Sequence, residues 1–414
     1  MAKGSRKDLR VDRVSEFSFP PGPIIGGKEM AKIAVTGLRG VPATWGGVEH
    51  QCEQTYARLA ARGHQVTIYA RTHYVPEGMD FYRGMTVRRL PTINTRYTEA
   101  FVHTFLSVLD IIRTQPRIVH IYAQGPCLFS PLVRLFRPRI RIFFTCTGLD
   151  WQRKKWPRWA SRVIRLGEVF SALFPHYRIT VSKDLQNYYR TVYGVSTHYI
   201  PNGVEKAKRR APAIIRDFGL EGGGYFLSVG RLVPEKRIED LVKAFLAGPR
   251  RSKLVIVGGS AGTEEYVERL KEAAAGARNI IFAGYQFGDA LAEFFSNALA
   301  FVTPSELEGL PLTLLEAMSY GIPCIISDIP PHMEVLDDHR FKFPVGDVRA
   351  LSNLMNEIEG MEESELAAVG RHAVEIVERR FDWDGIADQI ERLYMESLGE
   401  EAARTPRKPE YLEE

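Results

Sequence analysis

The sequence predicts an α/β fold with two domains, each built around a parallel β-sheet. Its 414 residues suit two or three domains. Short β-branched and apolar runs alternate with longer helical segments along most of the chain, which is typical of βαβ units. A charged segment without periodicity, residues 205–216, interrupts this alternation once and predicts the domain boundary.

The first domain is expected to span residues 30–205. It begins with a β-branched run at residues 32–37, which predicts a buried parallel strand. Gly63 is expected to end the first helix, and Ser182 to cap the last one. Further strands are expected at 64–70, 86–90, 118–122, 141–145 and 177–181, and helices at 48–62, 98–113, 126–136, 161–174 and 182–193. Residues 1–29 are basic and contain Pro and Gly clusters, so we expect a disordered extension.

The second domain is expected to span residues 216–381 and to open with a strand that starts at Tyr225. Strands are expected at 254–258, 279–282, 299–303 and 324–327, and helices at 264–274, 291–296, 348–359 and 364–380. A further helix should begin near Pro311, because proline suits the first helical turn. A final helix is expected at 382–398, followed by a disordered tail at 402–414.

The composition is that of an ordinary globular protein, with 45% hydrophobic and 25% charged residues. No apolar run approaches the ~20 residues that a membrane-spanning helix needs, and the N-terminal region lacks the apolar segment of a signal peptide. Four cysteines are scattered without the spacing of a metal site or a disulfide framework: Cys52, Cys127, Cys146 and Cys324. We therefore expect a cytoplasmic protein without a bound metal.

Charge is distributed unevenly between the two halves of the chain. Residues 1–205 carry 30 Lys and Arg against 14 Asp and Glu, whereas residues 206–414 carry 25 against 36. A basic half favours anionic partners, and since no nucleic-acid motif accompanies it, an anionic membrane surface or acceptor is preferred over nucleic acid. The residues that could rest on anionic lipid are Arg134, Arg137, Arg139, Arg141, Arg153, Lys154, Lys155 and Arg158, with Trp151, Trp156 and Trp159. A solvated basic face with core tryptophans is the competing interpretation.

The strongest functional pattern lies at residues 305–318, a predicted strand–loop–helix. Glu308 falls in the loop and Glu316 in the second turn of the helix. The helix N-terminus offers backbone N–H groups to a phosphate; the residues concerned are Gly309, Leu310, Pro311 and Leu312, of which proline has no N–H. Carboxylates beside an anion site are best explained if they accept hydrogen bonds from sugar hydroxyls. Phosphate and polyol together indicate a sugar nucleotide.

Two further elements fit a diphosphate. Gly46 and Gly47 precede a predicted helix and let its backbone approach a ligand closely, although a Gly-rich turn alone is a weak signal. Arg231 and Lys236 stand at a strand-to-helix junction, where they would bring two positive charges to the phosphates. The structural alternative for this pair is a solvated pair of cations at a helix start.

These segments resemble the retaining glycosyltransferases of family 4, which have the GT-B fold. Residues 305–318 match the family's E-x7-E signature, and Glu316-Ala317-Met318-Ser319-Tyr320-Gly321-Ile322-Pro323 matches its E-A-M-x-x-G-x-P run. Residues 230–236 are similar to the family's G-R-L-x-x-x-K element, and residues 201–204 to its P-N-G-V turn. The loop at residues 40–49 resembles a rhamnosyltransferase-like subgroup of bacterial surface polysaccharide synthesis. The resemblance covers about residues 31–398.

The resemblance implies a donor-binding second domain, an acceptor-binding first domain and a C-terminal helix that crosses back to the first domain. It implies transfer from a nucleoside-diphosphate sugar to a glycan or lipid-diphosphate-linked acceptor. The basic residues and tryptophans of the first domain, rather than the resemblance, favour peripheral contact at the inner face of the cell membrane. Arg231 and Lys236 would stabilise the leaving diphosphate, Glu308 would hold the sugar and Glu316 the ribose. The leaving phosphate would help to deprotonate the incoming hydroxyl on the same face, giving retention. No metal and no cofactor besides the donor are implied.

Three residues are assigned by the resemblance to acceptor binding or sugar positioning: Glu49, Thr147 and Asp150. The run that starts at Thr147 resembles the subgroup's H-G-L-D-W-Q-R segment, but threonine replaces its histidine. A threonine hydroxyl can form hydrogen bonds but cannot titrate near pH 7. This departure motivates an alternative function, a non-catalytic GT-B subunit that holds a sugar nucleotide or a partner enzyme. A GT-B sugar-nucleotide epimerase is a further alternative that the motifs disfavour.

Overall fold

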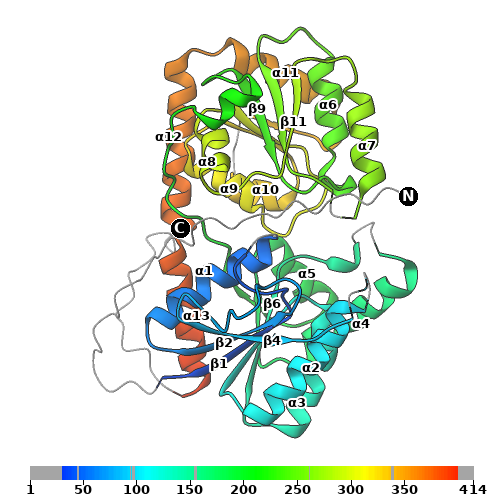
Figure 1. Ribbon diagram of the computed structural model, residues 1–414, viewed down its shortest axis with the longest axis vertical. Coiled ribbons are helices and arrows are strands. Elements are labelled where there is room, and N and C mark those ends of the chain that lie inside the picture. Colours follow the sequence, from blue (N-terminus) through cyan, green and yellow to red (C-terminus); the bar gives the residue numbers. More distant parts are fainter. Residues whose placement is uncertain are drawn as a thin grey trace.

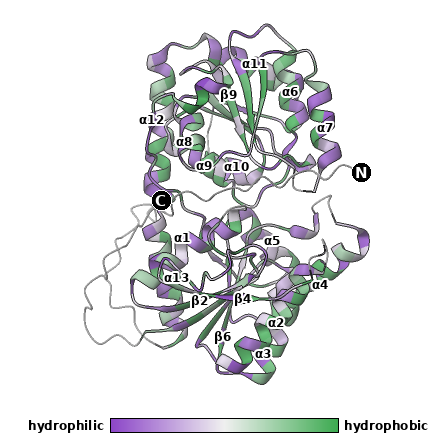
Figure 2. Cartoon of the chain, viewed as in Figure 1, coloured by the Kyte–Doolittle hydropathy of each residue, from purple (hydrophilic) through white to green (hydrophobic). Residues whose placement is uncertain are grey.

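The computed structural model describes residues 30–43, 46–93, 95, 98–152, 156–260, 262–336 and 340–399. The predicted extension at 1–29 and the predicted tail at 402–414 lie outside these residues. The chain forms two lobes, each with a central sheet between helices (Figure 1). In both lobes the strands are the most continuously hydrophobic segments (Figure 2), because parallel sheets are covered on both faces.

The first lobe contains an eight-stranded sheet in the order β3-β4-β2-β1-β5-β6-β7-β8. Its strands are β1 (Lys32–Thr36), β2 (Gln65–Arg71), β3 (Phe81–Tyr82), β4 (Met85–Leu90), β5 (Ile118–Tyr122), β6 (Arg141–Cys146), β7 (Tyr177–Thr180) and β8 (His198–Tyr199). All neighbouring strands are parallel except β3, which forms a short hairpin with β4. The sequence did not predict β3, which is only two residues long.

Helices cover both faces of this sheet. One face is packed by α1 (Gly47–Ala61) and the C-terminal α13 (Trp383–Ser397). The other face is packed by α2 (Glu99–Thr114), the 3-10 helix η1 (Gly125–Phe129), α3 (Ser130–Phe136), α4 (Arg158–Leu173) and α5 (Lys183–Tyr193). The single helix predicted at 126–136 is therefore divided into η1 and α3.

The second lobe contains a six-stranded, fully parallel sheet in the order β11-β10-β9-β12-β13-β14. The strands are β9 (Tyr225–Val229), β10 (Lys253–Val257), β11 (Ile280–Gly284), β12 (Ala300–Thr303), β13 (Cys324–Ser327) and β14 (Lys342–Phe343). One face is packed by α6 (Ile238–Leu246), α7 (Glu264–Ala273) and α11 (Val348–Gly360). The other is packed by α8 (Gly288–Ser296), α9 (Leu312–Ser319), α10 (Pro330–Val335) and α12 (Glu363–Arg380). This architecture confirms the predicted α/β class with two parallel sheets.

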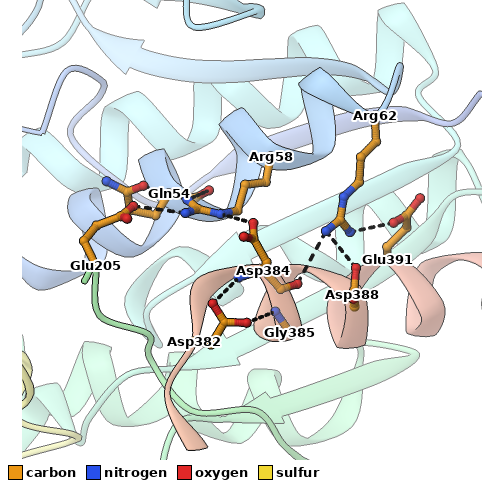
Figure 3. A network of polar contacts seen from close by, with 9 residues as sticks. All are labelled: Gln54, Arg58, Arg62, Glu205, Asp382, Asp384, Gly385, Asp388 and Glu391. Carbon is orange, nitrogen blue, oxygen red and sulfur yellow. Dashed lines mark hydrogen bonds and ion pairs between the residues drawn. The ribbon is translucent and has the colours of Figure 1, made fainter. Parts of the chain in front are cut away.

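The C-terminal helix α13 ties the end of the chain to the first lobe, where it lies beside α1 (Figures 1 and 3). Arg58 of α1 binds Asp384 at 2.7 Å and Glu205 of the linker at 3.0 Å. Arg62 binds both Asp388 and Glu391 at 2.7 Å (Figure 3).

Glu391 is the best buried member of this network, with a side chain that is 9% exposed. His64, which the sequence interpreted as structural, contacts the Glu391 carboxylate through Nε2 at 3.1 Å. Burial alone would raise the pKa of Glu391, but the hydrogen bond with His64 and the charge of Arg62 lower the pKa to about 2.

This lowered pKa predicts a pH-dependent contribution to stability. The contribution should be complete above the ordinary glutamate pKa of about 4.3 and lost progressively as the pH falls toward 2. We expect Glu391→Gln to lower the free energy of unfolding by about 2 kcal/mol at pH 7, with a smaller difference at pH 3. Urea unfolding of both proteins at pH 7 and at pH 3 measures this difference in the free energy of unfolding. Asp388→Asn is the control, since Asp388 binds the same arginine but is 44% exposed. An equal cost of Glu391→Gln at both pH values would contradict this account.

Candidate active site

A narrow pocket of about 40 Å³ opens where the strand ends of the two lobes face each other. The first lobe contributes the loop after β6, and the second lobe contributes the loops after β9 and β12. The lining residues are Gly148, Leu149, Arg231, Glu235, Lys236, Leu307, Glu308 and Gly309. Three predicted site residues, Arg231, Lys236 and Glu308, therefore lie together in one interdomain pocket.

Lys236 and Glu308 form an ion pair in this pocket through Lys236 Nζ and Glu308 Oε1. Their side chains are 18% and 12% exposed. The Ser305 hydroxyl also donates to Glu308 Oε1, at 2.9 Å. Burial alone would raise the pKa of Glu308, but the Lys236 ammonium and these hydrogen bonds hold that pKa below its usual range. The site therefore presents an ionised carboxylate beside a cation, and Glu308 Oε2 has no hydrogen-bond partner among the described residues.

The loop that carries Glu308 is fixed by contacts with two other segments of the second lobe. Arg237, next to Lys236, binds Glu306 at 3.0 Å and Asp240 at 2.6 Å. The Ser327 hydroxyl donates to the Ser305 carbonyl at 2.6 Å, so β13 supports the same loop. These contacts fix the position of Glu308 relative to Lys236, although the two residues are far apart in the sequence.

Helix α9 begins at Leu312, one residue after the proline that the sequence placed at its start. The backbone N–H groups of Gly309, Leu310 and Leu312 have no acceptor among the described residues, so they are available to an anion. Gly309 also touches the first lobe, since a Cβ on Gly309 would lie 1.9 Å from the Thr147 carbonyl oxygen. Only glycine permits this approach between the lobes.

The glycine loop of the first lobe also meets α9. A Cβ on Gly47 would lie 2.8 Å from Leu312 Cδ1, and Gly46 has a positive φ of 100° that favours glycine. Glu49, which the resemblance assigned to acceptor or sugar positioning, accepts a hydrogen bond from the Arg39 backbone N–H at 3.1 Å. Its observed contact is therefore with the loop that contains the glycines, and a contact with substrate stays a prediction.

A second, larger cavity of about 160 Å³ lies beside α9, between the interdomain linker and α8. Glu316 and Leu312 of α9 line it together with His50 of α1 and residues 203–207 of the linker. Burial raises the pKa of Glu316 to about 7. Among the described residues the Glu316 side chain has no hydrogen-bond or ion-pair partner, so this carboxylate is available to a ligand.

The loop with Thr147 and Asp150 is anchored by Glu168, a residue that the sequence analysis missed. Glu168 lies on α4 and is fully buried. Its carboxylate accepts hydrogen bonds from Trp151 Nε1 at 2.8 Å and from Gln124 Nε2 at 2.5 Å, and the Gln124 side-chain oxygen accepts from the Asp150 backbone N–H at 3.2 Å. Two tyrosine hydroxyls also donate to it, those of Tyr188 and Tyr193. A single acidic residue in the mostly apolar run of residues 166–173 was the signal available in the sequence.

Among the residues that the structure describes, no cluster of His, Cys, Asp and Glu side chains could hold a metal ion. All four cysteines are buried and free.

Two family models match the chain, one on each lobe. The model described as Glycosyltransferase Family 4 matches residues 45–208, and the model described as Glycosyl transferases group 1 matches residues 212–373. Together they cover most of the described chain.

Individual proteins agree with these models. An O-antigen chain mannosyltransferase B of Escherichia coli is 28% identical over 49% of this chain, a region that spans about half (53%) of that relative. A lipopolysaccharide 1,6-galactosyltransferase of E. coli K12 is 26% identical over 70% of this chain and 82% of its own length.

Among solved structures, HepE of Anabaena in complex with UDP and glucose superimposes with a TM-score of 0.73 at 18% identity, covering 89% of this chain and 99% of HepE. This similarity concerns the fold. The two matched models and the two-lobed architecture place the chain in the GT-B glycosyltransferases of the group 1 and family 4 type.

Proposed function

We propose that this protein is a retaining glycosyltransferase that moves a sugar from a nucleoside-diphosphate sugar to a glycan or lipid-diphosphate-linked acceptor. One observation carries the proposal: Arg231, Lys236, Glu308 and Gly309, whose backbone N–H has no acceptor among the described residues, line a single pocket that the first lobe closes. This set combines cations and N–H donors for a diphosphate with a carboxylate for hydroxyl groups.

The cations and amides act on the departing diphosphate. Negative charge builds up on the bridging oxygen as the sugar–phosphate bond breaks, so Arg231, Lys236 and the amides of Gly309 and Leu310 stabilise the transition state more than the ground state. Glu308 Oε2 accepts a hydrogen bond from a sugar hydroxyl, while Oε1 stays bound to Lys236 and Ser305. Metal independence is part of this proposal and remains to be measured.

The nucleoside occupies the larger cavity beside α9, where Glu316 accepts hydrogen bonds from the ribose hydroxyls. The HepE complexes with UDP and with UDP-glucose support a sugar-nucleotide donor for a chain of this fold. The names of the two E. coli relatives support a role in the synthesis of cell-surface polysaccharide. A deoxysugar donor is suggested by the subgroup resemblance of residues 40–49 alone.

Retention of configuration fits the chemistry of the pocket. Glu308 is committed to an ion pair with Lys236, which makes its carboxylate a weak nucleophile toward the sugar. The leaving phosphate can instead take the proton of the acceptor hydroxyl on the face from which it departs. Thr147, which lies at the lobe contact, supplies a hydroxyl but no titratable group near pH 7.

The transfer proposal is tested by the rate at which donor sugars are consumed. We expect one of UDP-glucose, UDP-galactose, GDP-mannose and dTDP-rhamnose to release its nucleoside diphosphate slowly with water as acceptor. Lys236→Ala should lower this rate at least ~100-fold, because it removes a charge that acts on the leaving group. Lys243→Ala, at an exposed lysine of α6, is the control. Release that is equal in Lys236→Ala and the unmodified protein would overturn the proposal, and no release from any donor would favour the non-catalytic alternative.

The raised pKa of Glu316 predicts a pH dependence of nucleotide affinity. The ionised carboxylate is the better acceptor for ribose hydroxyls, so affinity should increase as the pH rises through about 7. Between pH 6 and pH 8 we expect a gain of about tenfold for the best-binding nucleoside diphosphate, measured by calorimetry. Glu316→Gln should remove this gain in affinity. Any pH dependence of affinity that comes from titration of the nucleotide itself remains in this variant. The same pH profile in both proteins would rule out a role for Glu316 in binding.

A further inference from the structure

The helices α2, α3 and α4 expose an unusual concentration of large apolar side chains. Nine of the seventeen exposed large hydrophobic residues in the described chain lie on these three helices: Phe101, Phe105, Leu109, Leu135, Phe136, Trp159, Val163, Leu166 and Leu173. The three helices lie on the same side of the first lobe (Figure 1), and α3 contacts both α2 and α4, so their exposed sides form one outer surface. We call it the α2–α4 surface.

Helix α4 is turned so that its apolar side faces outward. Its buried residues are small or polar: Ala160, Gly167, Glu168, Ser171 and Ala172. Its exposed apolar residues, Trp159, Val163, Leu166 and Leu173, recur at helical spacing and lie along one side. A surface helix of a globular protein normally has the opposite arrangement, with large apolar residues against the core. Figure 2 shows hydrophobic and hydrophilic segments alternating along this helix.

The charges on the α2–α4 surface have one sign. Six arginines are exposed on or just after these helices: Arg113, Arg134, Arg139, Arg158, Arg162 and Arg165. The acidic residues of the three helices are directed inward: Glu99 binds Arg71 at 2.8 Å, Asp110 binds Arg88 at 3.1 Å, and Glu168 is fully buried. Among their described residues, the three helices thus expose cations and apolar groups but no carboxylate.

The structure also refines the residues that the sequence proposed for lipid contact. Trp151 is not interfacial, because its ring N–H donates to the buried Glu168. Arg137 donates to the Ile112 carbonyl at 2.8 Å and so helps to hold α2 and α3 together. Trp159 is the tryptophan that is exposed, at 55%. Arg153, Lys154 and Lys155 lie outside the described residues.

We propose that the α2–α4 surface docks on an anionic membrane. Exposed arginines bind lipid phosphates, while Trp159, Leu166 and their apolar neighbours enter the boundary between headgroups and acyl chains. Charge complementarity favours an anionic membrane over a second copy of the chain as the partner of this surface. A symmetric contact between two copies would bring two arginine-rich surfaces together. No helix among the described residues is long and apolar enough to span a bilayer, so the contact is peripheral.

Docking at this surface also places the cleft near the lipid. The outer side of α4 faces the membrane, and its inner Glu168 anchors the loop with Gly148 and Leu149 that lines the active-site pocket. The inference goes beyond the proposed sugar transfer and does not depend on it, because docking is measured without donor or acceptor.

Co-sedimentation of the full chain with vesicles tests the proposal. Vesicles of phosphatidylcholine with 30% phosphatidylglycerol should bind the protein, pure phosphatidylcholine vesicles should bind it weakly, and 0.5 M NaCl should reduce binding to the anionic vesicles. A charge variant, Arg139→Glu with Arg158→Glu and Arg162→Glu, should lower the partition coefficient at least ~100-fold. An apolar variant, Leu135→Ser with Val163→Ser and Leu166→Ser, should also lower it.

A matched control carries the same charge change on the second lobe, at exposed arginines: Arg251→Glu, Arg278→Glu and Arg371→Glu. This control should bind anionic vesicles nearly as well as the unmodified protein, because its substitutions lie outside the α2–α4 surface. All substituted residues are exposed, and an unchanged thermal unfolding midpoint verifies folding. The proposal is overturned if the unmodified protein does not bind anionic vesicles or if the control loses as much binding as the charge variant. It is also overturned if the apolar variant dissociates a dimer while vesicle binding stays unchanged.

Discussion

The ion pair between Lys236 and Glu308 is the constraint around which the candidate site is built. Two opposite charges that are largely removed from water need each other and further hydrogen bonds, because an unpaired buried charge is very costly. Ser305 supplies one such bond, and Arg237 and Ser327 hold the loop that carries the carboxylate. The pair sits at the ends of β9 and β12, so the central strands of the second sheet determine its position.

The second requirement is that the first lobe closes against this pair. Gly309 meets the Thr147 carbonyl, Gly47 meets Leu312, and the loop that bears Thr147 is anchored to the buried Glu168 of α4. Helix α13 returns the chain to the first lobe, where Arg62 and Glu391 fasten it. The same α4 presents its large apolar residues and arginines outward. One helix therefore connects the proposed membrane contact with the proposed chemistry.

Much of the fold could be predicted because buried parallel strands have a distinctive composition. The strand predicted at 254–258, for example, is β10 at Lys253–Val257. The strand-to-helix junction expected at Arg231 and Lys236 is where helix α6 follows, although the sequence analysis gave this helix no bounds. Strands β3 and β14 were missed because two-residue strands carry no periodicity. The sequence placed Lys236 and Glu308 at the site one by one. Their pairing, and the tie from Glu168 to Trp151, depend on contacts between distant segments that local patterns do not encode.

The account rests on the claim that this cleft binds a nucleoside diphosphate, and thermal unfolding tests it most directly. The unmodified protein and Arg231→Ala would be unfolded with UDP, GDP, dTDP and ADP, each with and without magnesium. A nucleotide at about 100 times its dissociation constant should stabilise the fold by roughly 2.7 kcal/mol, which is readily seen as a higher midpoint. We predict such a shift with one of the four nucleotides and its loss in Arg231→Ala. No shift with any nucleotide, or an equal shift in Arg231→Ala, would contradict the account.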